Sequence, residues 1–118
     1  MNREIKFKFW NTKTSCMYYD TGLTSLGIKD GFDLAISNHY IPMQYTGLKD
    51  KNGKEIYEGD IVKCEQKGEY KIGRVIFKAG GFWWEFDNGN VSYLDGVIKK
   101  FKGEIIGNIY ENPELINN

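Results

Sequence analysis

The segment from Arg74 to Asp87 constrains the fold more than any other part of the chain, because apolar and polar residues alternate on either side of Gly80-Gly81. Successive side chains of a strand point to opposite faces, and two adjacent glycines accept the positive φ of a two-residue turn. We therefore expect a hairpin with a core face that pairs Phe77 with Trp84, Val75 with Phe86 and Ala79 with Phe82. The opposite face then pairs Lys78 with Trp83, Ile76 with Glu85 and Arg74 with Asp87.

A second turn is expected at Asn88-Gly89, a pair of residues typical of tight hairpin turns. A two-residue turn here adds a third strand and sets Phe86 against Val91 and Trp84 against Tyr93 on the core face. Outside, it sets Glu85 against Ser92 and Trp83 against Leu94. The pattern thus predicts a three-stranded meander with one continuous inner surface.

The rest of the chain also favours short strands, so we predict an all-β protein. Residues 1–41 are expected to form an N-terminal β-hairpin, with Phe7 and Phe9 on one face and Lys6 and Lys8 on the other, followed by a variable insert from residue 21. Within this insert a short strand is expected near Phe32–Ile36. Residues 42–118 form the second part. Further strands are predicted at 43–47, 61–64, 97–101 and 104–110. A helical turn is predicted after them, with Asn112 as its cap and Pro113 at its first position.

Charge and cysteine content exclude several functional classes. Lys plus Arg equals Asp plus Glu at 16 each, so the positive excess of a dedicated duplex-DNA binder is missing. Cys16 and Cys64 lie far apart and form no metal-binding pair, so we expect reduced thiols in a cytoplasmic protein without a membrane segment. His39 has no nucleophile motif near it, and Glu55, Glu58 and Asp60 match no calcium loop. We expect no enzyme, metal or cofactor.

One long motif carries a family resemblance. The run Gln44-Tyr45-Thr46-Gly47-Leu48 and the following residues 50–62, DKNGKEIYEGDIV, resemble the hallmark of the YopX family of phage and prophage proteins. The opening residues 3–10, the Gly81-Phe82-Trp83 segment and the closing residues 106–115 agree with it. The resemblance implies an all-β protein whose C-terminal part is a small SH3-like barrel, and it implies no activity, because the family has no established biochemical role.

We interpret the motif mainly as a set of tight turns, with a loop for a ligand or partner as the alternative. Its members are Tyr45, Gly47, Asn52, Gly53, Tyr57, Gly59 and Asp60. The glycines suit positive φ, and the Asp60 carboxylate is expected to accept backbone N–H groups. The two tyrosine rings are expected to close over the loop with their hydroxyl groups outward.

The best candidate for a binding surface lies on the predicted outer face of the meander. Ile76, Trp83 and Leu94 would form an apolar patch beside Arg74 and Lys78, unless the N-terminal hairpin or Ile109 and Tyr110 cover it. We expect a protein partner or self-association at this patch. The alternative is a single nucleic-acid strand that stacks on Trp83 and is contacted by Arg74, Lys78 and the basic run Lys99, Lys100 and Lys102. If this run lies at a strand edge, its lysines would instead guard against aggregation.

Overall fold

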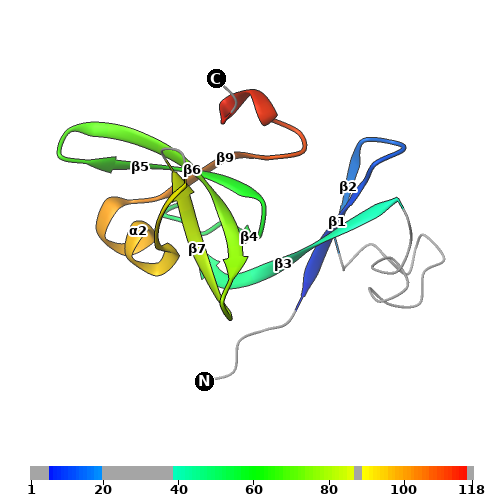
Figure 1. Ribbon diagram of the computed structural model, residues 1–118, viewed down its shortest axis with the longest axis horizontal. Helices are drawn as coiled ribbons and strands as arrows, with labels where there is room; N and C mark the ends of the chain where they lie inside the picture. Colours follow the sequence, from blue (N-terminus) through cyan, green and yellow to red (C-terminus); the bar gives the residue numbers. More distant parts are fainter. Residues whose placement is uncertain (1–5, 20–38, 87–88, 117–118) are drawn as a thin grey trace. The chain divides into compact units, whose positions relative to one another are not determined.

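The computed structural model describes residues 6–19, 39–86 and 89–116, in two compact units, Met1–Tyr45 and Thr46–Asn118 (Figure 1). The second part predicted from the sequence begins at residue 42. The strand predicted near Phe32–Ile36 lies outside the described residues. Strands dominate the structure, as predicted, and one short α-helix accompanies them.

The first unit is built around β1 (Phe7–Asn11), which pairs antiparallel with both β2 (Cys16–Tyr19) and β3 (Tyr40–Lys49). Phe9 is 1% exposed and packs with the partly buried Phe7, Tyr18 and Tyr40. The opposite side of β1 is buried too, since Lys8 is only 4% exposed. The predicted hairpin is therefore present as β1 and β2, and β1 lies between β2 and β3.

The second unit contains a curled five-stranded sheet in the order β8-β7-β6-β5-β9, which forms a half-barrel. Its elements are β4 (Glu55–Tyr57), β5 (Asp60–Gln66), β6 (Glu69–Lys78), β7 (Gly81–Phe86), β8 (Asn90–Tyr93), α2 (Leu94–Phe101), β9 (Glu104–Asn108) and the 3-10 helix Pro113–Leu115. The remaining strands form a four-stranded sheet in the order β2-β1-β3-β4. In this sheet β4 lies beside β3, and the Thr46 hydroxyl donates to the Ile56 carbonyl at 2.8 Å.

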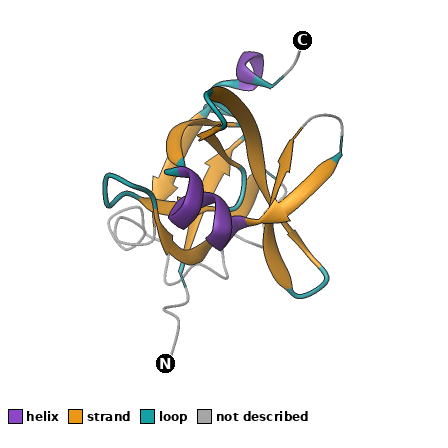
Figure 2. Ribbon diagram, turned by 90° about the vertical axis from the view of Figure 1, so that its left-hand side faces the viewer, coloured by secondary structure: helices purple, strands orange, loops and turns teal. Residues whose placement is uncertain are grey.

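The core of this unit lies between the inner face of the five-stranded sheet and α2, the purple α-helix of Figure 2. Its buried members are Ile56, Val62, Cys64, Val75, Trp84, Leu94 and Val97. We call the opposite side of the sheet the outer face.

The register of the first predicted hairpin is wrong by two residues. Val75 pairs with Trp84 and Phe77 with Phe82, so the turn consists of Ala79 and Gly80, both with positive φ, and not of Gly80-Gly81. A shift by two keeps every side chain on its predicted face, which is why Val75 and Trp84 still reach the core. Phe77 lies at the end of the hairpin and is 48% exposed, contrary to the prediction.

The register of the second hairpin is wrong by one residue, and this exchanges the faces of β8. Phe86 pairs with Asn90, which leaves three residues in the loop instead of two, and Trp83 therefore pairs with Tyr93. Tyr93 and Val91 consequently point outward, at 71% and 40% exposure. Leu94 turns inward and is 1% exposed.

The strand predicted at 97–101 is part of helix α2. The spacing of Leu94, Val97, Ile98 and Phe101 is the three- and four-residue repeat of a helix, and all four side chains belong to or pack against the core. The other three strands predicted with it, at 43–47, 61–64 and 104–110, are present as β3, β5 and β9, and β9 already ends at Asn108. The helical turn at Pro113 is also present, but the side chain of Asn112 does not cap it and instead accepts the Asn108 N–H at 3.2 Å.

Candidate functional site

An apolar row crosses the outer face at the level of Ile76, Trp83 and Tyr93, which are direct cross-strand neighbours on β6, β7 and β8. The rings of Trp83 and Tyr93 are stacked, with centroids 4.6 Å apart and planes inclined by 23°. The Trp83 indole N–H donates to the Lys78 carbonyl at 2.9 Å, which holds the ring against the hairpin. The Trp83 ring of this stack is thus fixed, while the Tyr93 side chain stays largely exposed.

The next row contains an ion pair. The Arg74 Nε donates to the Glu85 carboxylate at 2.9 Å, and Val91 follows on β8. Ile61, which is opposite Arg74 on β5, is fully buried. The exposed part of the outer face therefore begins at β6 and extends over β7 to β8.

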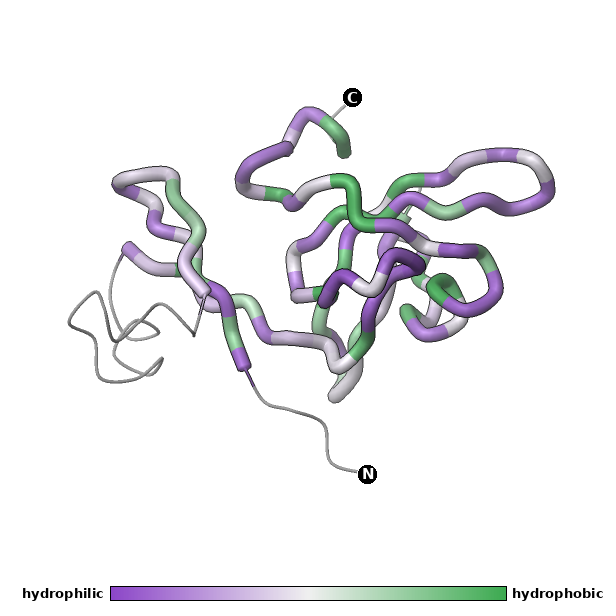
Figure 3. Tube along the Cα trace, turned by 180° about the vertical axis from the view of Figure 1, so that it is seen from behind, coloured by the Kyte–Doolittle hydropathy of each residue, from purple (hydrophilic) through white to green (hydrophobic). Residues whose placement is uncertain are grey.

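The far end of the β5–β6 hairpin extends beyond the other strands (Figure 3). β7 pairs with β6 only from Gly73 onward, and β9 pairs with β5 only as far as Lys63. Tyr70 and Ile72 lie on the outer face of this extension and are 66% and 38% exposed. The Lys63 ammonium sits 4.5 Å from the centroid of the Tyr70 ring.

The structure therefore keeps four of the five residues predicted for the candidate surface on the outer face. Ile76, Trp83, Arg74 and Lys78 lie there, whereas Leu94 is a core residue and is replaced by Tyr93. Sequence reasoning missed Tyr93, Val91, Tyr70 and Ile72. The helical spacing that begins at Leu94 was the signal that could have placed Leu94 inside and Tyr93 outside.

The basic run predicted at a strand edge belongs to α2. Lys99 and Lys100 occupy its last turn, Lys102 is the residue after its end, and Lys99 pairs with Asp95 at 3.1 Å. Because α2 packs against the inner face through Leu94 and Val97, its lysines are not neighbours of Trp83 on the outer face.

The turn motif around Asp60 is closed by its own backbone. The Asp60 carboxylate is 2% exposed and accepts the Tyr57 N–H at 2.8 Å, as predicted. Gly59, with φ 89°, donates its N–H to the Val75 carbonyl at 2.8 Å. Both motif tyrosines are buried, and the Tyr57 hydroxyl donates to Glu55 at 3.4 Å.

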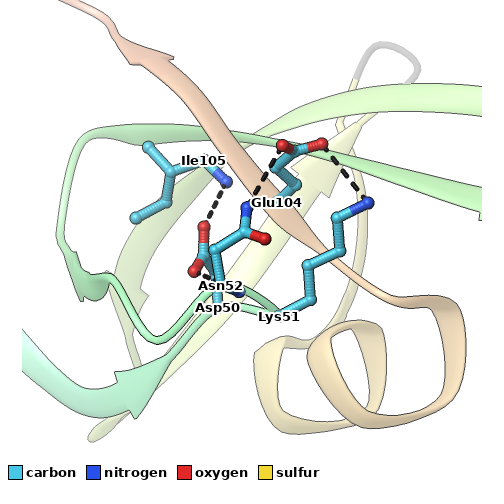
Figure 4. Close-up of polar contacts among 5 residues, drawn as sticks. All are labelled: Asp50, Lys51, Asn52, Glu104 and Ile105. Carbon is cyan, nitrogen blue, oxygen red and sulfur yellow. Dashed lines mark hydrogen bonds and ion pairs between the residues drawn. The ribbon is translucent and has the colours of Figure 1, made fainter.

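Asp50 organises the Asn52-Gly53 turn and connects it to β9 (Figure 4). One carboxylate oxygen accepts the Asn52 and Lys54 N–H groups at 2.9 Å each, and the other accepts the Ile105 N–H at 3.0 Å. The Asn52 amide and the Lys51 ammonium both reach the Glu104 carboxylate, at 3.2 and 3.5 Å. This role of Asp50 was not predicted from the sequence.

The remaining titratable groups singled out from the sequence are the two cysteines and His39, and the structure adds Tyr110. Burial raises the pKa of the Cys64 thiol, and Cys16 is exposed; both are free cysteines. Burial, and secondarily the charge of Glu58, raises the pKa of Tyr110. His39 lies in a turn and contributes its backbone carbonyl to Thr12. Across residues 6–19, 39–86 and 89–116, no three His, Cys, Asp or Glu side chains gather as metal ligands, and no helix is long and apolar enough to cross a membrane.

Comparison with known proteins gives a family and a fold. The family model described as YopX protein matches residues 6–117. The chain is similar to the crystal structure of protein EF1440 from Enterococcus faecalis, with a TM-score of 0.67 and 28% identity over 98% of this chain and 100% of that chain. It is also similar to the X-ray structure of protein yopX from Bacillus subtilis, with a TM-score of 0.63 and 22% identity over 95% and 98% of the two chains. No curated protein matches.

Proposed function

The chain belongs to the YopX family, and from this premise we propose that it is a non-enzymatic module that binds another protein through its outer face. The observation that carries the proposal is the distribution of exposed apolar side chains. Of the six large hydrophobic residues that are exposed in the described parts, four lie on this face: Tyr70, Ile72, Val91 and Tyr93. Burying one such side chain contributes about 1.5–3 kcal/mol before ordering costs.

The arrangement of these residues supports a protein ligand. Tyrosine and tryptophan rings that are held rigidly are the usual anchors of protein interfaces. Here the Trp83 indole is fixed by Lys78 and stacked on Tyr93, so little side-chain freedom is lost on binding. The Arg74–Glu85 pair lies beside them and supplies donors and acceptors for a polar rim.

Single-stranded nucleic-acid binding is the second candidate, and the exposed Tyr93 ring favours it because bases stack on such rings. Two observations rank it lower. Of the two cations expected beside Trp83, Lys78 lies on the outer face but Arg74 is engaged by Glu85, and the lysines of α2 are not part of the same face. The formal net charge of zero also limits attraction to a polyanion.

The proposal also covers the origin of the protein, its location and the type of its barrel. We place the protein in the cytoplasm of a bacterium that carries a phage or prophage, with the second unit as a small barrel of the SH3-like type. The family resemblance supports the origin and the barrel type. Two unpaired cysteines, of which Cys16 is exposed, would stay reduced in the cytoplasm.

The proposal is tested by site-specific photocrosslinking in cells of the source organism. A benzophenone amino acid replaces Tyr93 or Tyr70, and Lys100 on α2 is the matched control, because it is also exposed. We expect a discrete protein adduct from the two outer-face positions and none from the control, with mass spectrometry naming the partner. Equal labelling from all three positions would argue against this surface.

The nucleic-acid alternative is tested separately with a labelled single-stranded oligonucleotide at low ionic strength. If the protein is a protein-binding module, we expect no saturable binding of the oligonucleotide. Binding that weakens steeply with added salt and is abolished by Tyr93→Ala would favour the alternative instead.

A further inference from the structure

The Asn52-Gly53 step in the turn at 50–54 brings together the two groups that react in the deamidation of asparagine. Asn52 is exposed, and the residue after it has no side chain that would shield its backbone nitrogen. A Cβ added at Gly53 would meet nothing within 4 Å, so the space on this side of the glycine is open. The Gly53 nitrogen and the side-chain carbonyl carbon of Asn52 are thus neighbours at the surface of the protein.

Deamidation of this step needs only water as a co-reactant. The Gly53 nitrogen, on losing its proton, forms a bond to the Asn52 Cγ, and the side-chain nitrogen leaves as ammonia, which carries that proton away. Water then opens the resulting succinimide ring at one of its two carbonyl groups. The product is either aspartate or isoaspartate, whose main chain runs through the former side-chain carbon. Asparagine is for this reason one of the thermolabile residues of proteins.

The hydrogen bonds of the turn hold this reaction back in the folded protein. The Gly53 N–H donates to the Asp50 carbonyl at 2.9 Å, so the attacking nitrogen is engaged. The Asn52 side-chain amide donates to the Glu104 carboxylate at 3.2 Å, which keeps it directed toward β9 (Figure 4). The Asp50 carboxylate fixes the same turn by accepting the Asn52 and Lys54 N–H groups, at 2.9 Å each. The attack therefore requires this set of bonds to open first.

We propose that Asn52 is a site of deamidation that Asp50 controls, and that its conversion detaches the turn at 50–54 from β9. Before the reaction, two side chains of the turn hold this strand. Asn52 donates to Glu104, and the Asp50 carboxylate accepts the Ile105 N–H at 3.0 Å. Together they cap the β9 edge of the five-stranded sheet.

The products of the reaction weaken this connection in two ways. A carboxylate at position 52 has no N–H to donate, and it meets the Glu104 carboxylate as a like charge. Lys51, whose ammonium lies 3.5 Å from Glu104, is left to neutralise two acids instead of one. Isoaspartate also inserts a methylene group into the main chain before Gly53, so the N–H groups that follow no longer match Asp50. Deamidation thus acts as a one-way switch that loosens the β9 edge.

The test measures conversion of Asn52 by peptide mapping after incubation at mildly alkaline pH, with a free peptide of residues 49–56 as the reference. We expect Asn52 to convert at least about tenfold more slowly in the wild-type protein than in the peptide, because the turn must open first. Asp50→Ala should bring the rate close to that of the peptide. Trp84→Phe is the matched control, since it removes a bond to the Val62 carbonyl within the sheet and leaves the turn intact, and its rate should stay near that of the wild type.

Two further readouts separate a local effect from a general loss of structure. The second Asn-Gly step of the sequence, Asn88-Gly89, is followed in the same digests, and its rate should not respond to Asp50→Ala. The deamidated wild-type protein is separated by anion exchange, and its Ile105 amide should exchange faster than in the unmodified protein.

Several results would overturn the proposal. These are conversion of Asn52 at the peptide rate in the wild type, no acceleration in Asp50→Ala, an equal acceleration in Trp84→Phe or at Asn88, and unaltered exchange at Ile105 in the deamidated protein.

Discussion

The indole N–H of Trp84 donates to the carbonyl of Val62 at 3.0 Å, and both side chains are fully buried. Trp84 lies on β7 and Val62 on β5, two strands apart in the sheet order. The ring spans the intervening strand at Gly73, where an added Cβ would lie 2.7 Å from the indole. This contact joins three strands of the sheet from the inner side.

Trp84→Phe should lower the free energy of unfolding by about 2–4 kcal/mol, because the Val62 carbonyl loses its donor and a cavity remains. Trp83→Phe is the matched control, since its indole bonds the Lys78 carbonyl at an exposed site, and it should cost less than about 1.5 kcal/mol. Urea denaturation followed by circular dichroism measures both. Equal losses would show that the buried bond has no special weight.

Gly73→Ala should destabilise the protein by more than about 2 kcal/mol, since the new Cβ would lie 2.5 Å from the backbone carbonyl oxygen of Glu85. Gly96→Ala should instead stabilise it by about 0.5–1 kcal/mol, because Gly96 is in α2 and nothing lies within 4 Å of its added Cβ. Thermal unfolding midpoints of the two variants should move in opposite directions. A Gly73→Ala variant as stable as the wild type would contradict the close packing of Trp84.

Asp50→Ala should cost about 2–4 kcal/mol, because three backbone N–H groups lose their common acceptor. Asp50→Asn retains one side-chain oxygen and should cost less. Hydrogen exchange at Ile105 reports the effect directly, and we expect its amide to lose protection in Asp50→Ala. Unchanged exchange at Ile105 would mean that Asp50 does not cap the β9 edge.

Cys64 should be far less reactive toward a thiol reagent than Cys16, because it is buried and its pKa is raised above the ordinary value of 9.0. As pH rises past that value, the unfolded chain loses the thiol proton before the folded chain does. The folded state therefore loses stability toward alkaline pH, and the effect is absent below the ordinary pKa. Cys64→Ala should flatten the alkaline slope of the unfolding free energy, and an unaltered slope would refute the assignment.

Much of the fold could be predicted locally. The alternating residues of β6 and β7 assign each side chain to a face, and Val75 and Trp84 reach the core as predicted even though the predicted register is wrong. The turn at Asp60 could also be predicted, because a carboxylate next to Gly59 satisfies nearby backbone donors. The role of Asp50 could not, since one of its partners, Ile105, lies 55 residues away.

The amino-acid sequence by itself determined the strand content, the inner and outer sides of β6 and β7, and the family to which the chain belongs, because these depend on short-range patterns. Only the tertiary structure decided the composition of the outer face. The length of one loop, three residues instead of two before Asn90, exchanges the faces of β8, so it brings Tyr93 to Trp83 and sends Leu94 into the core with α2. Loop length is set by which pairing buries more side chains across the whole unit, and residues near the turn do not encode that comparison.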